Sequence, residues 1–439
     1  MHPVGGVNGG GVRVGETARM AGGRRARRSA AAVPAPLRRA LDLLGPTTGA
    51  AGQTLGALGL NSITSFVAGA IMVALIPTFR EVPGLLVLMT PAIGLCGNVF
   101  TTFGNRLSTA IHIGTYSPSL RGRGVMGQNL RAAFTLVGAM SVALAVLARL
   151  LASVIGQPTV ALPELVAIAV VGGLLGAVPN VLLAVALTRG AVRRGWDLDN
   201  LVAPVVSTFG DVLTIPALWL AAVAVRRAGV ADAVCAVAVV VTAIAVVLSL
   251  RSPHPELRRI VVESGPILVA ALVLDTLGGL VLQHQLNALA VLPAVFVLIP
   301  AFVSSGGALG GILCGRVSTA LHLGNLRPTG LPGRAARRDV AFLAALAVPV
   351  FALNGVGAVL FAPLSGSGGD PGWGWTTAVS LIAGAITMVA VVAISWWTTV
   401  GAFRVGVDPD SAGVPIMSAA IDVIGAATVI AVVFALGLH

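Results

Sequence analysis

The sequence predicts an all-α polytopic membrane protein built from a tandem duplication, and three observations support this prediction. The 439-residue chain is 56% hydrophobic and only 10% charged, whereas ordinary soluble domains carry about 25% charged residues. Apolar stretches of about 20 residues recur along the chain, and each is long enough to cross the roughly 30 Å hydrocarbon core of a bilayer as a helix. Two motifs also occur twice, in the same order and at nearly the same separation.

The apolar stretches predict eleven membrane-spanning helices, five in each repeat and one between the repeats. The second and eighth stretches, which contain Pro91 and Pro300, are long enough to run past the membrane or to break. The predicted ranges are 53–78, 84–110, 131–155, 162–188, 200–225, 229–250, 259–282, 287–320, 339–363, 373–399 and 412–437.

The N-terminal segment, residues 1–44, predicts a disordered cytosolic tail. It is rich in glycine and arginine, includes RRARR at residues 24–28, and has no apolar core close to these arginines, unlike a cleaved signal. Most of the loop arginines fall on the same side of the membrane as this tail, so the positive-inside rule places the N-terminus in the cytoplasm. We expect a multi-pass protein of a bacterial plasma membrane.

The charge and cysteine content exclude several classes of protein. The formal net charge is +12. We interpret the abundance of arginine, together with the richness in alanine, valine and glycine, as an effect of codon composition. The charge therefore gives no reason to expect a nucleic-acid partner. Cys96, Cys235 and Cys314 all lie in apolar stretches, so neither a disulfide framework nor a cysteine-rich metal site is expected.

The two repeated motifs establish the duplication. NRLSTAIHIG (105–114) returns as GRVSTALHLG (315–324), 210 residues later. DLDNLVAPVVSTFGDV (197–212) returns as DPDSAGVPIMSAAIDV (408–423), 211 residues later. In the second motif, Asp197, Asp199, Pro204, Ser207 and Asp211 align with Asp408, Asp410, Pro415, Ser418 and Asp422.

The odd number of spans in each repeat predicts the role of the helix between them. Two directly joined five-helix copies would lie upside down relative to each other, and one extra crossing restores a parallel orientation. We expect a pseudo-twofold axis along the membrane normal. The predicted domains are residues 45–226, a linker helix at 227–252, and residues 253–439.

Asp211 and Asp422 are the principal candidate site residues. A carboxylate at the centre of a membrane helix costs about 2.5–3.5 kcal/mol on insertion scales, so each should face water or a partner. Mg²⁺ prefers oxygen ligands and keeps several of its waters. The absence of a histidine or cysteine beside them in sequence argues against a soft-metal site. The alternative is a structural role, in which each aspartate pairs with an arginine or caps a broken helix, although neither fifth span contains an arginine.

A third acid, Asp275, breaks the symmetry of the two carboxylates. Asn61 in LGLNSITS is its expected counterpart in the first repeat. Asp275 could serve as a second ion site, as a proton site, or as a hydrogen-bonding position between helices, and the sequence does not choose among these roles.

The second-helix segments LMTPAIGLCGNVFTTFGNRLSTAIHIG and LIPAFVSSGGALGGILCGRVSTALHLG resemble the signature of the MgtE family of magnesium channels and transporters. The chain is most similar to the two-copy branch, the eukaryotic solute-carrier magnesium transporters. The resemblance extends over residues from about 50 to 439 without the linker span, and it also includes the spacing from proline to aspartate in the fifth helices.

The resemblance implies two five-helix domains that enclose a cation pathway, in which the fifth-helix aspartates bind the hydrated ion. The implied metal-site residues are Asp211 and Asp422, with oxygen from Ser207 and Ser418 one turn earlier. Ala203 and Val414 depart from the family pattern, which often has asparagine before the proline. Asn98 is a further secondary candidate together with Asp275 and Asn61, and its counterpart in the second repeat is Ala308.

These observations predict transport of divalent cations, with Mg²⁺ as the expected ion, across the plasma membrane through a pathway between the two repeats. No cofactor is expected, and the pathway should form within one chain, with further homodimerisation left open. The alternative is a proton- or sodium-coupled transporter of another cation that uses Asp275 as its coupling site. We do not expect an enzyme, because the chain contains neither an HExxH nor a Gly-x-Ser-x-Gly motif.

Overall fold

The computed structural model describes residues 48–112, 114, 116–117, 119, 124–194, 198–226, 230–328, 333–365, 372–407 and 409–437. Within these ranges, the structure describes only the backbone of residues 48–53, 105, 108–109, 112, 191–194, 198–208, 255, 334–335, 365 and 410–412. The predicted tail, residues 1–44, lies outside the described residues. The chain divides into two compact units, Met1–Gly56 and Ala57–His439, and the packing described below is that of the second unit.

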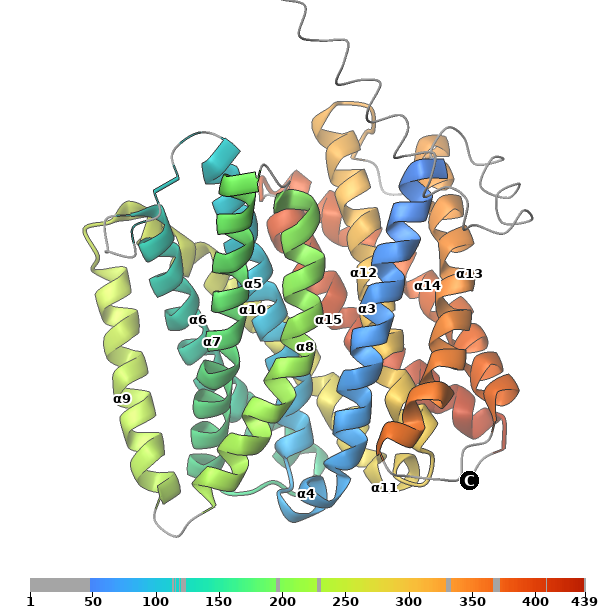
Figure 1. Cartoon of the computed structure of the whole chain (residues 1–439), viewed down its shortest axis with the longest axis horizontal. Helices are drawn as coiled ribbons and strands as arrows, with labels where there is room; N and C mark the ends of the chain where they lie inside the picture. The colour runs from blue at the N-terminus through green and yellow to red at the C-terminus, as the bar shows by residue number, and fades with distance from the viewer. Residues whose placement is uncertain are drawn as a thin grey trace, which may run out of the picture. The chain divides into compact units, whose positions relative to one another are not determined.

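All the regular elements in the described part of the chain are helices, which confirms the predicted all-α class (Figure 1). The first repeat contains α3 (Thr48–Ala74), α4 (Ile76–Glu81), α5 (Leu85–His112), α6 (Val125–Ile155), α7 (Leu162–Arg194) and α8 (Leu198–Val225). The helix between the repeats is α9 (Val230–Leu250). The second repeat contains α10 (Pro255–His284), α11 (Leu286–Leu289), α12 (Pro293–His322), α13 (Arg334–Phe361), the 3₁₀ turn η2 (Ala362–Ser365), α14 (Trp373–Arg404) and α15 (Pro409–Ala435).

The described residues contain ten helices that are long and apolar enough to cross a membrane. The remaining predicted span, 200–225, is α8, whose apolar part with described side chains is the shorter stretch Phe209–Val225. The predicted eighth span, 287–320, was wrong at its start, because the short helix α11 ends at Leu289 and α12 begins at Pro293.

The prolines of the two second helices do not interrupt them. Pro91 lies inside α5 and Pro300 lies inside α12, and each helix continues through the repeated motif at its C-terminal end. Proline is tolerated in membrane helices because neighbouring helices and local adjustments satisfy the freed backbone groups. The break that we considered from sequence is therefore absent from both helices.

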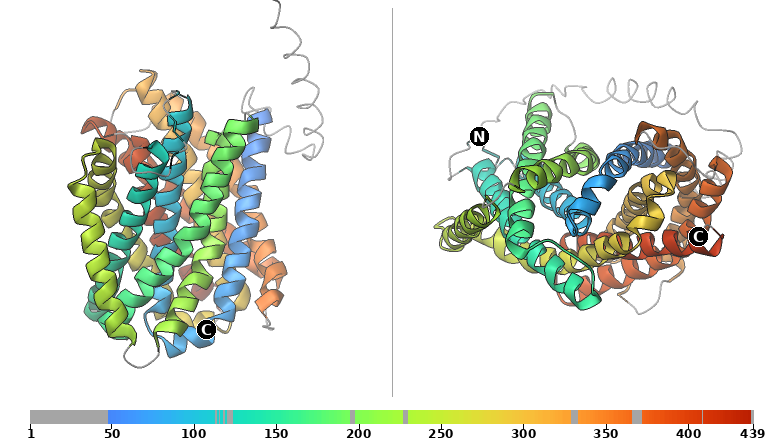
Figure 2. Two further views of the ribbon diagram at one scale, coloured as in Figure 1. Left: turned by 60° about the vertical axis from the view of Figure 1, so that its left-hand side comes forward. Right: turned by 90° about the horizontal axis from the view of Figure 1, so that it is seen from below.

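The linker helix α9 lies at the edge of the bundle, as expected from its role in reversing the chain direction (Figures 1 and 2). Only 11% of its most apolar window is buried. It packs chiefly against α6 and α7, and the hydroxyls of Ser249 and Thr135 form a buried hydrogen bond of 3.1 Å. Lipid can solvate its remaining surface, which is rich in exposed valine side chains.

The first helix of each repeat packs against the second helix of the other repeat. On α10, a Cβ at Gly279 would lie 2.8 Å from the carbonyl oxygen of Val87 on α5. On α3, a Cβ at Gly69 would lie 2.8 Å from the carbonyl oxygen of Val297 on α12. These reciprocal contacts at glycine allow close backbone approach, the usual device of membrane helix packing. The two repeats are therefore interleaved.

The reciprocal contacts also correct the predicted counterpart of Asp275. Gly69 and Gly279, like Val87 and Val297, are 210 residues apart, the same separation as in the second-helix motif. Because both helices are continuous, this register places Ser65 at the position equivalent to Asp275. The sequence-based pairing of Asp275 with Asn61 was wrong by about one helical turn.

The contact of Gly279 with α5 predicts that alanine substitutions at two glycines of α10 differ in their effect on the stability of the protein. Gly279→Ala should destabilise the protein by about 1–3 kcal/mol, because its methyl group would meet the Val87 backbone, which has no rotamer to change. Gly265→Ala is the matched control, since a Cβ there meets no atom within 4 Å. The fraction of purified protein that stays folded after heating should fall for Gly279→Ala only. Equal behaviour of the two variants would contradict the interleaved packing.

Candidate cation site

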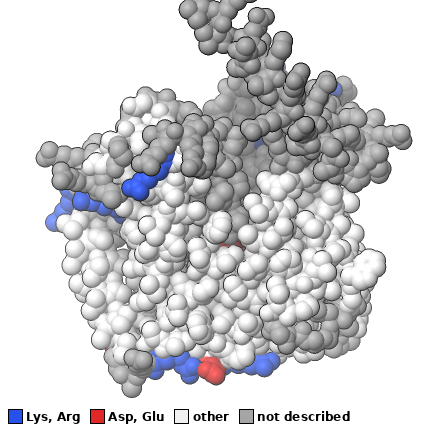
Figure 3. Space-filling view, in the orientation of Figure 1, with Lys and Arg blue, Asp and Glu red and all other residues white. Residues whose placement is uncertain are grey.

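Three acids lie inside the apolar helices: Asp211 on α8, Asp275 on α10 and Asp422 on α15. On the face shown in Figure 3, the basic side chains lie toward the two ends of the bundle, and a small acidic patch is visible in the otherwise uncharged middle. The ion pairs among the described side chains are Arg226–Glu81, Arg259–Glu263 and Arg316–Asp339, and none includes these aspartates.

Asp211 and Asp422 occupy equivalent places in the two repeats. Each lies on a fifth helix that packs against the second helix of its own repeat, α8 on α5 and α15 on α12. Each keeps partial solvent exposure although protein surrounds it. The two carboxyl groups are close enough for direct electrostatic interaction. The predicted pair therefore faces accessible space in the middle of the helices.

The structure describes the side chain of only one of the two serines predicted to contact the ion. Ser418 is half-buried, and its hydroxyl faces α12, where a Cβ at Gly307 would lie 3.0 Å from its Oγ. The side chain of Ser207 lies outside the described part of the structure, so its role stays a prediction. Within the described side chains, no group of three or more His, Cys, Asp and Glu residues is arranged to hold a metal ion directly.

Asp275 lies beside Asp422 and is only 1% exposed. The two carboxyl groups are within hydrogen-bonding reach of each other. Sequence reasoning did not bring these residues together, because no repeated motif marks the first helix of either repeat.

Asn61 forms a hydrogen-bonding pair with the other repeat. Its side-chain amide donates to Ser304 Oγ at 2.9 Å, and Ser304 Oγ donates back to Asn61 Oδ1 at 3.1 Å. The adjacent hydroxyls of Ser62 and Ser305 are 3.3 Å apart. These bonds give Asn61 a role in helix packing, and the secondary ion-binding role that we considered for it stays a prediction.

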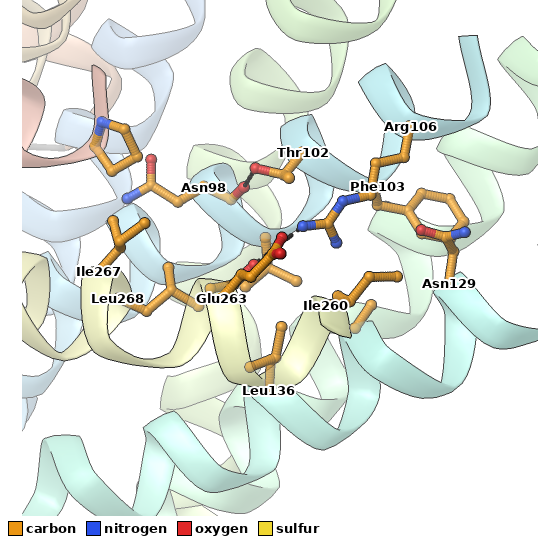
Figure 4. A pocket seen from close by; sticks show the side chains of 14 residues that line it. Asn98, Thr102, Phe103, Arg106, Asn129, Leu136, Ile260, Glu263, Ile267 and Leu268 are labelled. Carbon is orange, nitrogen blue, oxygen red and sulfur yellow. Dashed lines mark hydrogen bonds between the residues drawn. The ribbon is translucent and has the colours of Figure 1, made fainter. Parts of the chain in front are cut away.

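Asn98 lines a cavity of about 60 Å³ between α5, α6, α10 and α15. Figure 4 shows Asn98 in this cavity with Thr102, Arg106 and Glu263, and Pro415 of α15 also lines it. The Arg106 guanidinium donates to Ser264 Oγ at 3.1 Å. Burial lowers the pKa of Arg106, while the charges of Glu256 and Glu263 oppose this shift. The cavity thus lies between helices of both repeats, and its lining combines these polar side chains with a larger apolar surface.

In the second repeat, the arginine of the same motif makes different contacts. Arg316 corresponds to Arg106, and its guanidinium pairs with Asp339 at 2.7 Å and lies 4.8 Å from the ring centre of Phe342. The arginines of the two repeated second-helix motifs therefore have different partners, Ser264 for Arg106 and Asp339 with Phe342 for Arg316.

Cys96 is a neighbour of the site that the sequence did not reveal. It is buried on α5 and lies close to Thr214 and within electrostatic range of Asp211 on α8. The residues beside the aspartates in sequence gave no sign of this cysteine, because adjacency in sequence does not report contacts between helices. No motif around Cys96 signals this contact.

Comparison with known proteins identifies the family. Residues 89–221 and 299–432, together more than half of the chain, match the family model described as MgtE, divalent cation transporter. The chain belongs to the MgtE family. The two matches fall one in each repeat, so they also confirm the duplication that the motifs predicted.

The chain is also similar to members of solute carrier family 41. It is 24% identical to member 2 of Mus musculus over 371 residues, which cover 80% of this chain and 63% of the mouse protein. Member 2 of Xenopus laevis is 25% identical, with 80% and 65% covered, and member 3 of Rattus norvegicus is 27% identical, with 56% and 54% covered. The chain thus spans less than two thirds of the length of these relatives. No solved structure gives a significant match.

Proposed function

We propose that this MgtE-family chain transports divalent cations, with Mg²⁺ as the principal ion, across the plasma membrane through a pathway between its two repeats. In this proposal Asp211 and Asp422 bind the hydrated ion. The observation that carries it is the pair itself: two carboxylates from equivalent helices interact in the middle of the bundle, keep partial exposure and have no basic partner among the described side chains.

The chemistry of the pair suits a hydrated divalent ion. Two carboxylates attract a 2+ charge strongly, yet they leave most coordination positions to water, which Mg²⁺ gives up reluctantly. Oxygen atoms of Ser207 and Ser418 are the proposed additional contacts. A site of this kind can bind the ion well enough to admit it and weakly enough to release it, as conduction requires.

The proposed pathway lies within one chain, because the duplication supplies both fifth helices. The N-terminus is proposed to face the cytoplasm, as the distribution of loop arginines indicates. A further association of two chains outside the pathway is compatible with this arrangement.

Uptake by liposomes that contain the purified full chain tests the function. We expect Mg²⁺ to enter these liposomes faster than empty ones, and an excess of another divalent cation to slow its entry more than an excess of a monovalent cation does. An ion-sensitive dye inside the liposomes reports the entry. Uptake no faster than in empty liposomes would refute the proposal. Uptake that requires an imposed proton or sodium gradient would instead support the coupled alternative through Asp275.

A further inference from the structure

Asp275 is a buried acid without a base. Only 1% of the residue is exposed, and its Oδ1 atom has no hydrogen-bond partner. None of the ion pairs formed by the described side chains includes it. An unpaired buried carboxylate is costly, so a residue of this kind in a membrane bundle marks a functional position.

A second acidic side chain lies beside Asp275, which increases the need for a positive charge at this place. The carboxyl group beside it belongs to Asp422, which is itself within electrostatic range of Asp211. Carboxylates that face one another repel unless a bound cation or a shared proton relieves the repulsion. The described residues supply no cation here, and a cation on the proposed pathway would provide one.

The packing of α10 directs Asp275 toward the site. One turn after Asp275, a Cβ at Gly278 would lie 3.4 Å from the backbone carbonyl of Asp422, so α10 lies close against α15 at this level. On the α5 side, a Cβ at Gly94 would lie 2.8 Å from Asp275 Oδ2. The glycine at position 94 therefore leaves space for the Asp275 carboxyl group in its present position.

The other half of the molecule lacks this arrangement. The residue equivalent to Asp275 is Ser65, and the residue equivalent to Gly94 is Ser304. Ser304 exchanges hydrogen bonds with Asn61 instead of making room for a carboxylate. The first helix of the first repeat therefore contributes neutral groups at this level, whereas that of the second repeat contributes a charge.

We propose that Asp275 is a third carboxylate of the cation site, supplied by the second repeat alone, which acts with Asp422 on a hydrated divalent cation. The inference rests on the proposed function and deepens it. Since the three aspartates are not arranged for direct coordination of one ion, Asp275 is a positioning residue. Its charge attracts the cation through bound water, and its contact orients the Asp422 carboxyl group. A third negative charge favours divalent over monovalent ions.

Mg²⁺ binding to the purified full chain in lipid nanodiscs, measured by calorimetry, tests this proposal. Asp275→Asn should lower the Mg²⁺ affinity by about 10- to 100-fold, the usual effect of removing an outer-sphere partner of a metal ligand. Ser65→Ala, at the equivalent position of the first repeat, should not lower it. Asp275→Ser, which copies the first-repeat residue, gives a second measurement if the asparagine variant folds poorly.

Combined variants separate a charge at the site from a purely structural role. The effect of Asp275→Asn should shrink when Asp422→Asn is already present and should persist in an Asp211→Asn background. An equal loss in both backgrounds would overturn the partnership with Asp422. Parental affinity in both Asp275 variants would also overturn it, because asparagine and serine carry no charge.

The outcomes distinguish this inference from the proposed function. Binding that depends on Asp275 without any Mg²⁺ uptake would refute transport and support the third carboxylate. Uptake by the parent together with parental binding by the Asp275 variants would refute the third carboxylate alone.

Discussion

Replacing both Asp211 and Asp422 by asparagine should nearly abolish Mg²⁺ uptake, and each single replacement should lower uptake at least about tenfold. Asparagine keeps the size and polarity of the side chain, but each change removes half of the negative charge of the proposed pair. A loss of 1.4 kcal/mol in ion binding already corresponds to about a tenfold change. Initial rates of Mg²⁺ entry into liposomes that contain equal amounts of folded protein measure the effect.

Asp232→Asn provides a matched control for these changes. Asp232 lies in the first turn of the peripheral helix α9, so the same chemical replacement occurs away from the proposed pathway. This variant should transport Mg²⁺ at the parental rate. A folded Asp211→Asn/Asp422→Asn protein that transports like the parent would show that these carboxylates have a structural role.

The second large effect concerns the number of chains that form a pathway. Liposomes that contain a mixture of Asp211→Asn chains and Asp422→Asn chains should stay as inactive as liposomes with either variant alone. Each chain would hold one defective pathway, because both halves of the pair come from the same polypeptide. The rate of Mg²⁺ entry in mixed and unmixed preparations, co-expressed so that the chains can associate, measures this.

Recovery of uptake in the mixed preparation would contradict the single-chain pathway. A site formed by Asp211 of one chain and Asp422 of another would leave some intact sites in mixed dimers. The control is a mixture of parent and double-variant chains, whose uptake should scale in proportion to the amount of parent.

The repeated motifs and hydropathy were sufficient to predict the class, the duplication and the number of long helices. The motif containing Asp211 and Asp422 has the same register in both copies, so their equivalence follows from sequence alone. The peripheral position of α9 also follows, because a helix without a counterpart is needed only to restore the direction of the chain. These predictions rest on sequence order, which residue patterns record directly.

Contacts between helices were not predictable in the same way. In a membrane, a helix is apolar on the side that faces lipid and on the side that faces protein, so hydropathy does not show which helices touch. The interleaving through Gly69 and Gly279 and the approach of Cys96 to α8 were missed for this reason. The first helices carry no repeated motif, so Asp275 was paired with Asn61, when reciprocal glycine contacts pair it with Ser65.

The position of the bound ion shows whether Asp211 and Asp422 form the cation site. Crystals of the full chain grown with Mn²⁺, an oxygen-preferring substitute for Mg²⁺, would reveal the ion by its anomalous scattering. We expect a peak between the carboxyl groups of Asp211 and Asp422 in the parent and none there in the Asp211→Asn/Asp422→Asn protein. A peak at another place along the bundle, with the space between these two aspartates empty, would contradict this expectation.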